Sequence, residues 1–153
     1  KFDELFFIQL RLIKLKILNQ NKFQVTYDQC FRDVITACKI NKRARQSGGT
    51  WITNDMKKAY LELHRRGLAK SYEVWENDEL VGGLYGVDLG HVFCGESMFR
   101  TSSNASKFAF ICLAKEVEEK EYRLIDCQLH TKHLESLGAE LIPRKEFVEI
   151  LKG

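Results

Sequence analysis

An acid within an apolar stretch, and a second acid two positions from an amide, are the residues whose types and spacing could do chemistry. Glu96 lies in FCGESMF (residues 93–99), and an acid among apolar side chains costs free energy unless it is paired or used. Asp126 and Gln128 lie in LIDCQ (residues 124–128), which predicts a short buried strand. Residues two apart on a strand point to one face, so Asp126 could hold the Gln128 amide. Alternatively, Asp126 caps a turn at the strand end.

Neither a nucleophile nor a metal set accompanies these groups in the sequence. No serine or cysteine is arranged with a histidine and an acid, as nucleophilic catalysis requires. The five cysteines contain no CxxC pair and are odd in number, which predicts small apolar core residues in a reducing cytosol. His130 and His133 are three apart, but no cysteine or carboxylate completes a metal set around them. No metal is expected.

Length and composition are those of one soluble globular domain. The chain has 153 residues, of which 44% are hydrophobic and 29% charged, and a typical domain has about 100 to 200 residues. Residues 5–18 are rich in Leu, Ile and Phe but are interrupted by Arg11, Lys14 and Lys16. They therefore fall short of the roughly 20 apolar residues that span a bilayer, and no membrane partner is expected.

The charge is divided unevenly along the chain. Residues 1–70 carry 15 Lys and Arg against 6 Asp and Glu, whereas residues 71–153 carry 9 against 15. A basic half suits a polyanion such as RNA, and an acidic half suits a cationic second substrate. Two solvated surfaces are an equally good interpretation of the charge alone.

Helix signals dominate the first part of the chain. A capping-box pattern at residues 26–29 predicts a helix over residues 27–40. Thr53 or Asn54 should cap a second helix, which Gly67 ends in the left-handed conformation.

Strand signals dominate the second part. Residues 71–75, 80–87 and 91–94 alternate or are apolar throughout, and turn residues separate them, which predicts an antiparallel meander. The later elements are predicted to be a helix capped by Asn104, a strand at 124–127, a helix at 130–137, a strand at 140–142 and a last helix begun by Pro143. This order fits an α+β domain with one mixed, mainly antiparallel sheet flanked by helices.

Seven stretches occur in an order typical of one known family: GTWIT (49–53), EVW (73–75), VGGLYG (81–86), FCGESMF (93–99), NASK (104–107), LIDCQ (124–128) and SLGA (136–139). They closely resemble leucyl/phenylalanyl-tRNA protein transferases, the aminoacyltransferases of the bacterial N-degron pathway. The resemblance covers roughly residues 23 to 150, so residues 23–153 are the expected catalytic domain and residues 1–22 a poorly matched N-terminal segment. The family's Gly-Ile-Phe-Pro-Trp stretch, with its second stacking tryptophan, has no counterpart here.

The resemblance implies an acetyltransferase-like (GNAT-like) fold and an aminoacyl-transfer reaction without a cofactor. Leu, Phe or Met would pass from aminoacyl-tRNA to the α-amino group of proteins that begin with Arg or Lys, marking them for degradation. Converting an activated ester to an amide is downhill, so such an enzyme mainly holds two substrates in line and removes one proton. We expect a cytoplasmic monomer.

The resemblance also implies roles for particular residues. Asp126 and Gln128 correspond to the catalytic pair, in which the Gln128 oxygen is polarised toward the attacking amine. Glu96 is expected to recognise polar groups of the substrate. The Trp51 ring is expected to stack on the terminal adenosine of tRNA, the alternative being that it anchors its loop to the core. The expected apolar aminoacyl pocket, which can share its walls with the core, consists of Leu84, Phe93, Met98, Phe110, Leu113 and Ile125.

Two alternative functions remain open. One is an N-acyltransferase that uses acetyl-coenzyme A, but residues 100–103 contain no glycine where such acetyltransferases hold the pyrophosphate with a Gly-rich turn. The other is a non-catalytic remnant that binds tRNA or peptide. For tRNA, the basic loop at residues 42–49 offers Arg43 and Arg45 as phosphate contacts, although a solvated loop is the commoner outcome.

Overall fold

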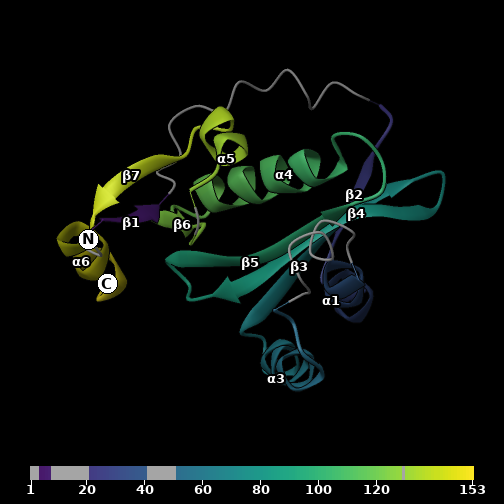
Figure 1. Cartoon of the computed structure of the whole chain (residues 1–153), viewed down its shortest axis with the longest axis horizontal. Helices are drawn as coiled ribbons and strands as arrows, with labels where there is room; N and C mark the ends of the chain where they lie inside the picture. Colours follow the sequence, from purple (N-terminus) through teal and green to yellow (C-terminus); the bar gives the residue numbers. More distant parts are fainter. Residues whose placement is uncertain (1–3, 8–20, 41–50, 129) are drawn as a thin grey trace.

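The computed structural model describes residues 4–7, 21–40, 51–128 and 130–153, with residues 4–7 described by their backbone alone. Its centre is a five-stranded sheet in the order β2-β3-β4-β5-β6 (Figure 1). The strands are β2 (Gln24–Tyr27), β3 (Ala69–Glu76), β4 (Glu79–Asp88), β5 (Val92–Arg100) and β6 (Leu124–Asp126). Neighbouring strands are antiparallel, except that β5 and β6 run parallel. The predicted mixed, mainly antiparallel sheet is therefore confirmed.

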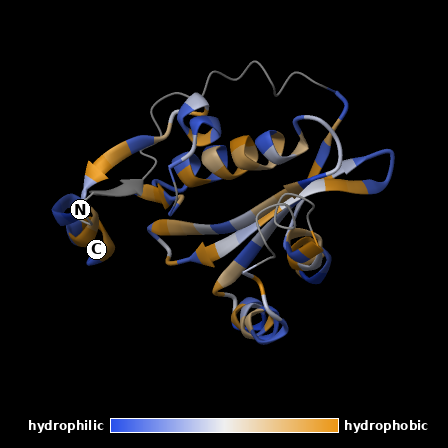
Figure 2. Cartoon of the chain, viewed as in Figure 1, coloured by the Kyte–Doolittle hydropathy of each residue, from blue (hydrophilic) through white to orange (hydrophobic). Residues whose placement is uncertain are grey.

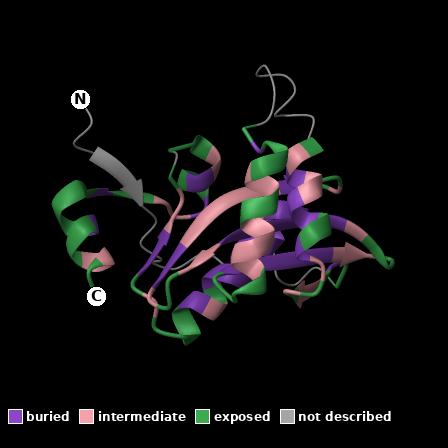
Figure 3. Ribbon diagram, turned by 90° about the horizontal axis from the view of Figure 1, so that it is seen from below, coloured by how far each residue is buried: buried purple, intermediate pink, exposed green. Residues whose placement is uncertain are grey.

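Helices cover both faces of this sheet (Figure 1). α1 (Phe31–Ile40) and α3 (Asn54–Arg65) lie on one face, and α4 (Ala105–Glu119) lies on the other. None of the helices that the structure describes is both long and apolar enough to cross a membrane. Figure 3 shows that buried residues concentrate on the strands and on the helix sides that meet them.

Adjacent residues of the central strand β4 belong to different cores, because side chains alternate along a strand. Leu84 packs in a cluster with Phe110 of α4. Tyr85 packs in a second cluster with Phe31 of α1. The sheet thus separates two apolar layers, and the neighbouring residues Leu84 and Tyr85 pack in different ones.

A small two-stranded sheet lies at one end of the molecule (Figure 1). In it β1 (Glu4–Phe7) pairs antiparallel with β7 (Glu140–Pro143), and two short helices, α5 (Lys132–Ser136) and α6 (Arg144–Leu151), flank β7 in the sequence. The strand predicted at residues 140–142 therefore exists, but it joins this second sheet instead of the main one. The difference has a packing cause, because Ile142 has its own cluster with Val92, Leu124 and Phe147.

The helix predicted over residues 27–40 begins only at Phe31. Thr26 lies in β2, where its hydroxyl donates to the Glu73 Oε2 at 2.6 Å and accepts from the Trp75 Nε1–H at 2.9 Å. The capping-box interpretation was wrong because the Thr26 hydroxyl has these distant partners. Asp28, at φ 56°, then turns the chain out of the strand.

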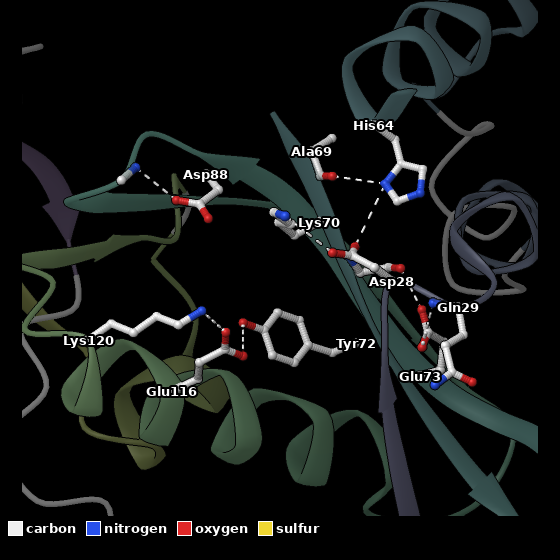
Figure 4. Close-up of polar contacts among 12 residues, drawn as sticks. Asp28, Gln29, His64, Ala69, Lys70, Tyr72, Glu73, Asp88, Glu116 and Lys120 are labelled. Atoms are coloured by element: carbon white, nitrogen blue, oxygen red, sulfur yellow. Dashed lines mark hydrogen bonds and ion pairs between the residues drawn. The ribbon is translucent and has the colours of Figure 1, made fainter. Parts of the chain in front are cut away.

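Glu73 takes over the cap that Thr26 does not supply. Its carboxylate is buried and accepts the Ser71 hydroxyl at 2.5 Å. It also accepts the backbone N–H groups of Gln29 and Cys30 at 3.4 and 3.5 Å, just before α1 (Figure 4). A carboxylate at a helix N-terminus satisfies free donors and is favoured by the helix dipole. One buried acid therefore fixes β2, β3 and the start of α1 together.

The predicted turns and caps are mostly confirmed. Asn77 and Asp78, both at positive φ (52° and 62°), form the two-residue turn between β3 and β4, whose hydrophilic tip is visible in Figure 2. Thr53 caps α3 by accepting the Met56 N–H at 3.1 Å. Asn104 precedes α4 as predicted, but at φ 68° its side chain makes no capping hydrogen bond.

Candidate active site

The candidate site lies where the parallel strands β5 and β6 part. They pair over only three positions, from Val92–Leu124 to Cys94–Asp126. β6 ends there, whereas β5 continues to Arg100. The sheet therefore opens beyond Cys94, and α4 covers this opening on one side.

A β-bulge in β5 places Glu96 at the opening. Tyr85 pairs with Ser97 and Gly86 pairs with Gly95, so that Glu96 has no partner on β4. A bulge re-aims the side chain of its extra residue and is common beside active sites. The bulge needs a glycine opposite it, since a Cβ on Gly86 would lie 2.3 Å from the Cys94 carbonyl oxygen.

The Glu96 carboxylate joins two distant segments. Its Oε2 accepts the Tyr60 hydroxyl of α3 at 2.8 Å, and its Oε1 accepts the Gln128 Nε2–H at 3.1 Å. Burial and the Glu96 contact raise the pKa of Tyr60, so the phenol stays protonated and remains a donor. The sequence analysis did not single out Tyr60 as a site residue, because its partner Glu96 lies 36 positions further along the chain.

The sequence analysis predicted that Asp126 holds the side-chain amide of Gln128. In the structure, Asp126 contacts the Gln128 backbone instead. The Asp126 Oδ1 accepts the Gln128 backbone N–H at 2.9 Å. Gln128 is past the end of β6 at φ 58°, so the alternation of a strand does not apply to it. Its amide turns to Glu96 instead. Asp126, Gln128 and Glu96 nevertheless form one connected chain of hydrogen bonds, which extends through Glu96 to Tyr60.

Burial raises the pKa of the Asp126 carboxyl; the Gln128 N–H opposes this shift and the nearby Glu96 adds to it. Two carboxylates and one amide thus share a partly dry site. Such an arrangement can hold the Gln128 amide oxygen in one orientation, and its carboxylates can act as weak bases.

An apolar cavity of about 100 Å³ adjoins this hydrogen-bond chain. Five of the six residues predicted for the aminoacyl pocket line it: Leu84, Met98, Phe110, Leu113 and Ile125. Glu96 and Ser97 contribute polar side chains to its lining. The other lining residues, Tyr85, Gly95, Cys127 and Leu134, were not identified in the sequence analysis, because periodicity does not distinguish a cavity wall from a core.

Phe93, the sixth predicted residue, lines a different cavity of about 200 Å³ that has polar walls. There the Tyr72 hydroxyl donates to Glu116 at 2.9 Å, and Lys120 pairs with the same carboxylate (Figure 4). Lys70 pairs with Asp28 at 3.4 Å. Because its charges pair with one another, this second cavity is best explained as a structural cluster.

Trp51 precedes α3 and leaves 48% of its surface exposed. Its ring meets the Tyr60 ring edge-on, with centroids 6.4 Å apart. An indole that is about half exposed is of a type that can stack on a flat ligand. Arg43 and Arg45 lie outside the residues that the structure describes.

Solved structures with a similar fold include acetyltransferases. A predicted acetyltransferase from Clostridium acetobutylicum, solved with acetyl-CoA, has a TM-score of 0.51 at 12% identity, covering 72% of this chain and 82% of that one. A functionally unknown conserved protein from Staphylococcus epidermidis also has a TM-score of 0.51, at 10% identity, covering 92% of this chain and 57% of that one. These likenesses confirm the expected acetyltransferase-like fold.

Sequence comparison gives the family. A family model described as leucyl/phenylalanyl-tRNA protein transferase matches residues 7–152. The protein of that name from Flavobacterium johnsoniae is 57% identical over 151 residues, which are 97% of this chain and 71% of the relative. Those from Flavobacterium psychrophilum and Azotobacter vinelandii are 54% and 52% identical over 136 residues, covering 89% of this chain but 64% and 59% of their own lengths. The chain belongs to the leucyl/phenylalanyl-tRNA protein transferase family.

Proposed function

We propose that this chain carries out aminoacyl transfer: Leu, Phe or Met moves from its tRNA ester to the α-amino group of a protein that begins with Arg or Lys, which marks that protein for degradation. Family membership supports the proposal. The observation that carries it is the Gln128 amide, which is held by Glu96, a residue that lines an apolar cavity. Donor side chain, reacting carbonyl and attacking amine can all be placed around that amide.

The reaction needs one proton to be moved. The amine nitrogen attacks the ester carbonyl carbon, the bond from that carbon to the tRNA ribose oxygen breaks, and the proton lost by the amine ends on the released hydroxyl. An α-amine has a reference pKa of about 7.7 to 8.0, so on the order of a tenth of it is neutral at pH 7. A weak base is therefore sufficient.

Gln128 is proposed to orient the amine. Its Nε2–H donates to Glu96, and a hydrogen bond to a carboxylate polarises the amide so that its oxygen becomes a better acceptor. This oxygen accepts an N–H of the attacking amine. Asp126 is proposed to hold the Gln128 main chain and to stabilise the positive charge that develops on the nitrogen.

The cavity is proposed to hold the donor side chain. A cavity of about 150 Å³ lined by Leu, Ile and Phe takes up benzene, so about 100 Å³ matches a branched aliphatic side chain more closely than a phenyl ring. Met98, an unbranched and adaptable wall residue, is suited to move aside for Phe.

Narrowing this cavity should separate the two donors. Leu84 is 3% exposed and lines the cavity, so Leu84→Phe should lower kcat/KM for Phe-tRNA more than for Leu-tRNA, by roughly 10-fold or more, the scale of one or two methylenes in an apolar pocket. Leu80→Phe, on the same strand but outside the cavity lining, is the matched control. Equal losses for both donors would place Leu84 outside the aminoacyl pocket.

The proposed partners follow from the same site. Trp51 is proposed to stack on the terminal adenosine of tRNA, because an exposed aromatic ring stacks on any base. We place the protein in the cytoplasm as a monomer, and its five free cysteines suit that reducing compartment.

One assay tests the function against its alternatives. The protein is incubated with an Arg-initiated peptide and labelled Leu-tRNA, Phe-tRNA or acetyl-coenzyme A, and acid-stable label on the peptide is counted. Transfer of Leu and Phe supports the proposal. Transfer of acetyl alone would mean that the protein is a coenzyme A-dependent N-acyltransferase. Absence of any transfer, together with retained binding of tRNA or peptide, would mean that it is a binding module.

A further inference from the structure

The Tyr85 hydroxyl in β4 is buried without a hydrogen-bond partner. It is the one buried side-chain nitrogen or oxygen in this state among the residues that the structure describes. The side chain is 0% exposed and lies between two aromatic rings, with centroid distances of 5.6 Å to Phe31 and 5.2 Å to Tyr60. A phenylalanine would fill this aromatic site without a polar atom.

An unpaired buried hydroxyl lowers the stability of the free protein, because its lost hydration is not replaced. Native structures hold few such groups, and each one calls for a physical reason. Packing supplies none for Tyr85, since the ring alone makes the aromatic contacts. The hydroxyl is therefore expected to gain its partner from outside the chain.

The position of Tyr85 indicates the chemistry of that partner. Tyr85 and Glu96 are both among the residues that line the apolar cavity, and Tyr85 pairs across the strands with Ser97. The Tyr85 side chain packs in the α1 layer, whereas that of its neighbour Leu84 packs in the α4 layer. The Glu96 carboxylate in the cavity lining attracts a cation. Burial first, and then Cys38, Tyr60 and Glu96, raise the pKa of Tyr85, so its hydroxyl stays neutral and can accept a hydrogen bond from an ammonium group.

The geometry points to the Tyr85 hydroxyl as a binding group for the primary α-amine of a substrate that occupies the aminoacyl cavity, which Tyr85 and Glu96 both line. This inference rests on the proposed function for the identity of the substrate. The amine of the donor amino acid fits best. Its side chain and its α-amine are bonded to the same carbon atom, so both lie near the cavity lining, which contains apolar side chains and the Glu96 carboxylate. Since the hydroxyl is screened from water in the empty cavity, the substrate must displace a neighbouring side chain to reach it.

The donor arm of the test compares Leu-tRNA with 2-hydroxy-4-methylpentanoyl-tRNA, in which a hydroxyl replaces the α-amine. The wild-type chain should prefer the amino donor in kcat/KM, and Tyr85→Phe should reduce this preference roughly 10-fold or more, the value of one hydrogen bond to a charged group. Tyr72→Phe, which deletes a buried hydroxyl that has a partner in Glu116, is the matched control and should leave the preference unchanged.

The acceptor arm compares an Arg-initiated peptide with its desamino form as inhibitors of transfer to a second peptide. If Tyr85→Phe reduces only the ratio of these two inhibition constants, the bound amine is that of the acceptor. If neither this ratio nor the donor preference changes, the inference is overturned.

Two further measurements do not require transfer. Tyr85→Phe should raise the Tm of the substrate-free protein by roughly 2 to 4 °C, whereas Tyr72→Phe should lower it. Wild type should bind leucinamide more tightly than 2-hydroxy-4-methylpentanamide, and Tyr85→Phe should remove the difference. A lower Tm for Tyr85→Phe, or an unchanged amide preference, counts against the inference, whereas absence of transfer by the wild type counts only against the proposed function.

Discussion

Replacing Asp126 by asparagine should lower the single-turnover rate of aminoacyl transfer by about 10² or more, the usual scale of help to a proton transfer. Asparagine keeps an oxygen for the Gln128 N–H, so the local turn survives while the charge is lost. Gln128→Ala should have an effect of similar size, because it removes the oxygen that orients the amine. The rates are measured with saturating Leu-tRNA and an Arg-initiated peptide.

The matched control is Asp88→Asn. Asp88 also accepts hydrogen bonds, from the Tyr122 hydroxyl and the Gly90 N–H, but it lines the other cavity. The Asp88→Asn variant should keep a near-normal rate of aminoacyl transfer. If Asp126→Asn and Gln128→Ala behave like this control, the catalytic pair is wrongly assigned.

Replacing Asp126 by asparagine should not destabilise the fold at neutral pH. Burial raises the pKa of Asp126 above its usual range, which means that folding favours the protonated form. The stability that protonation supplies is present at low pH and is lost as pH rises through the folded pKa, so at pH 7 the ionised group opposes folding. Asp126→Asn should therefore melt at the same or a higher temperature than the wild type while losing activity.

Glu73→Gln should be the most destabilising single change outside the active site. The Glu73 carboxylate is 0% exposed and accepts the hydroxyls of Thr26 and Ser71 as well as two backbone N–H groups. An amide has one oxygen in place of two and brings an NH₂ into a site built of donors. The loss should be about 2 to 3 kcal/mol, the scale of hydrogen bonds to a charged group, and the Tm should fall by roughly 5 to 10 °C.

The matched control is Glu79→Gln, at the exposed start of β4, which should change stability little. Both variants are compared by thermal and urea unfolding. Equal midpoints for the two would mean that the Glu73 carboxylate does not hold β2 and α1 to the sheet.

Features encoded locally could be predicted from the sequence. The β3–β4 turn depends on Asn77 and Asp78 alone, two residues that tolerate positive φ. The α3 cap depends on Thr53 and the next turn of helix. The family resemblance, and not local spacing, predicted five residues of the cavity wall, which come from β4, β5, α4 and β6.

Features that depend on distant partners were missed. The Thr26 hydroxyl fits a capping box in sequence, yet its partner Glu73 lies in a different strand. The contact between Tyr60 and Glu96 joins a helix to a bulge, and nothing near either residue indicates the other. The Gln128 conformation depends on β6 ending at Asp126, and the boundaries of elements are predicted from sequence less reliably than their existence.

The parting of β5 and β6 has a kinetic consequence. The cavity at this opening is lined both by Leu84, which belongs to the α4 layer, and by Tyr85, which belongs to the α1 layer. Two substrates can approach such an opening from different sides and be bound at once. Transfer then needs no covalent enzyme intermediate, and initial rates measured against both substrates should give intersecting double-reciprocal lines, as in a sequential mechanism, and not the parallel lines of a ping-pong mechanism.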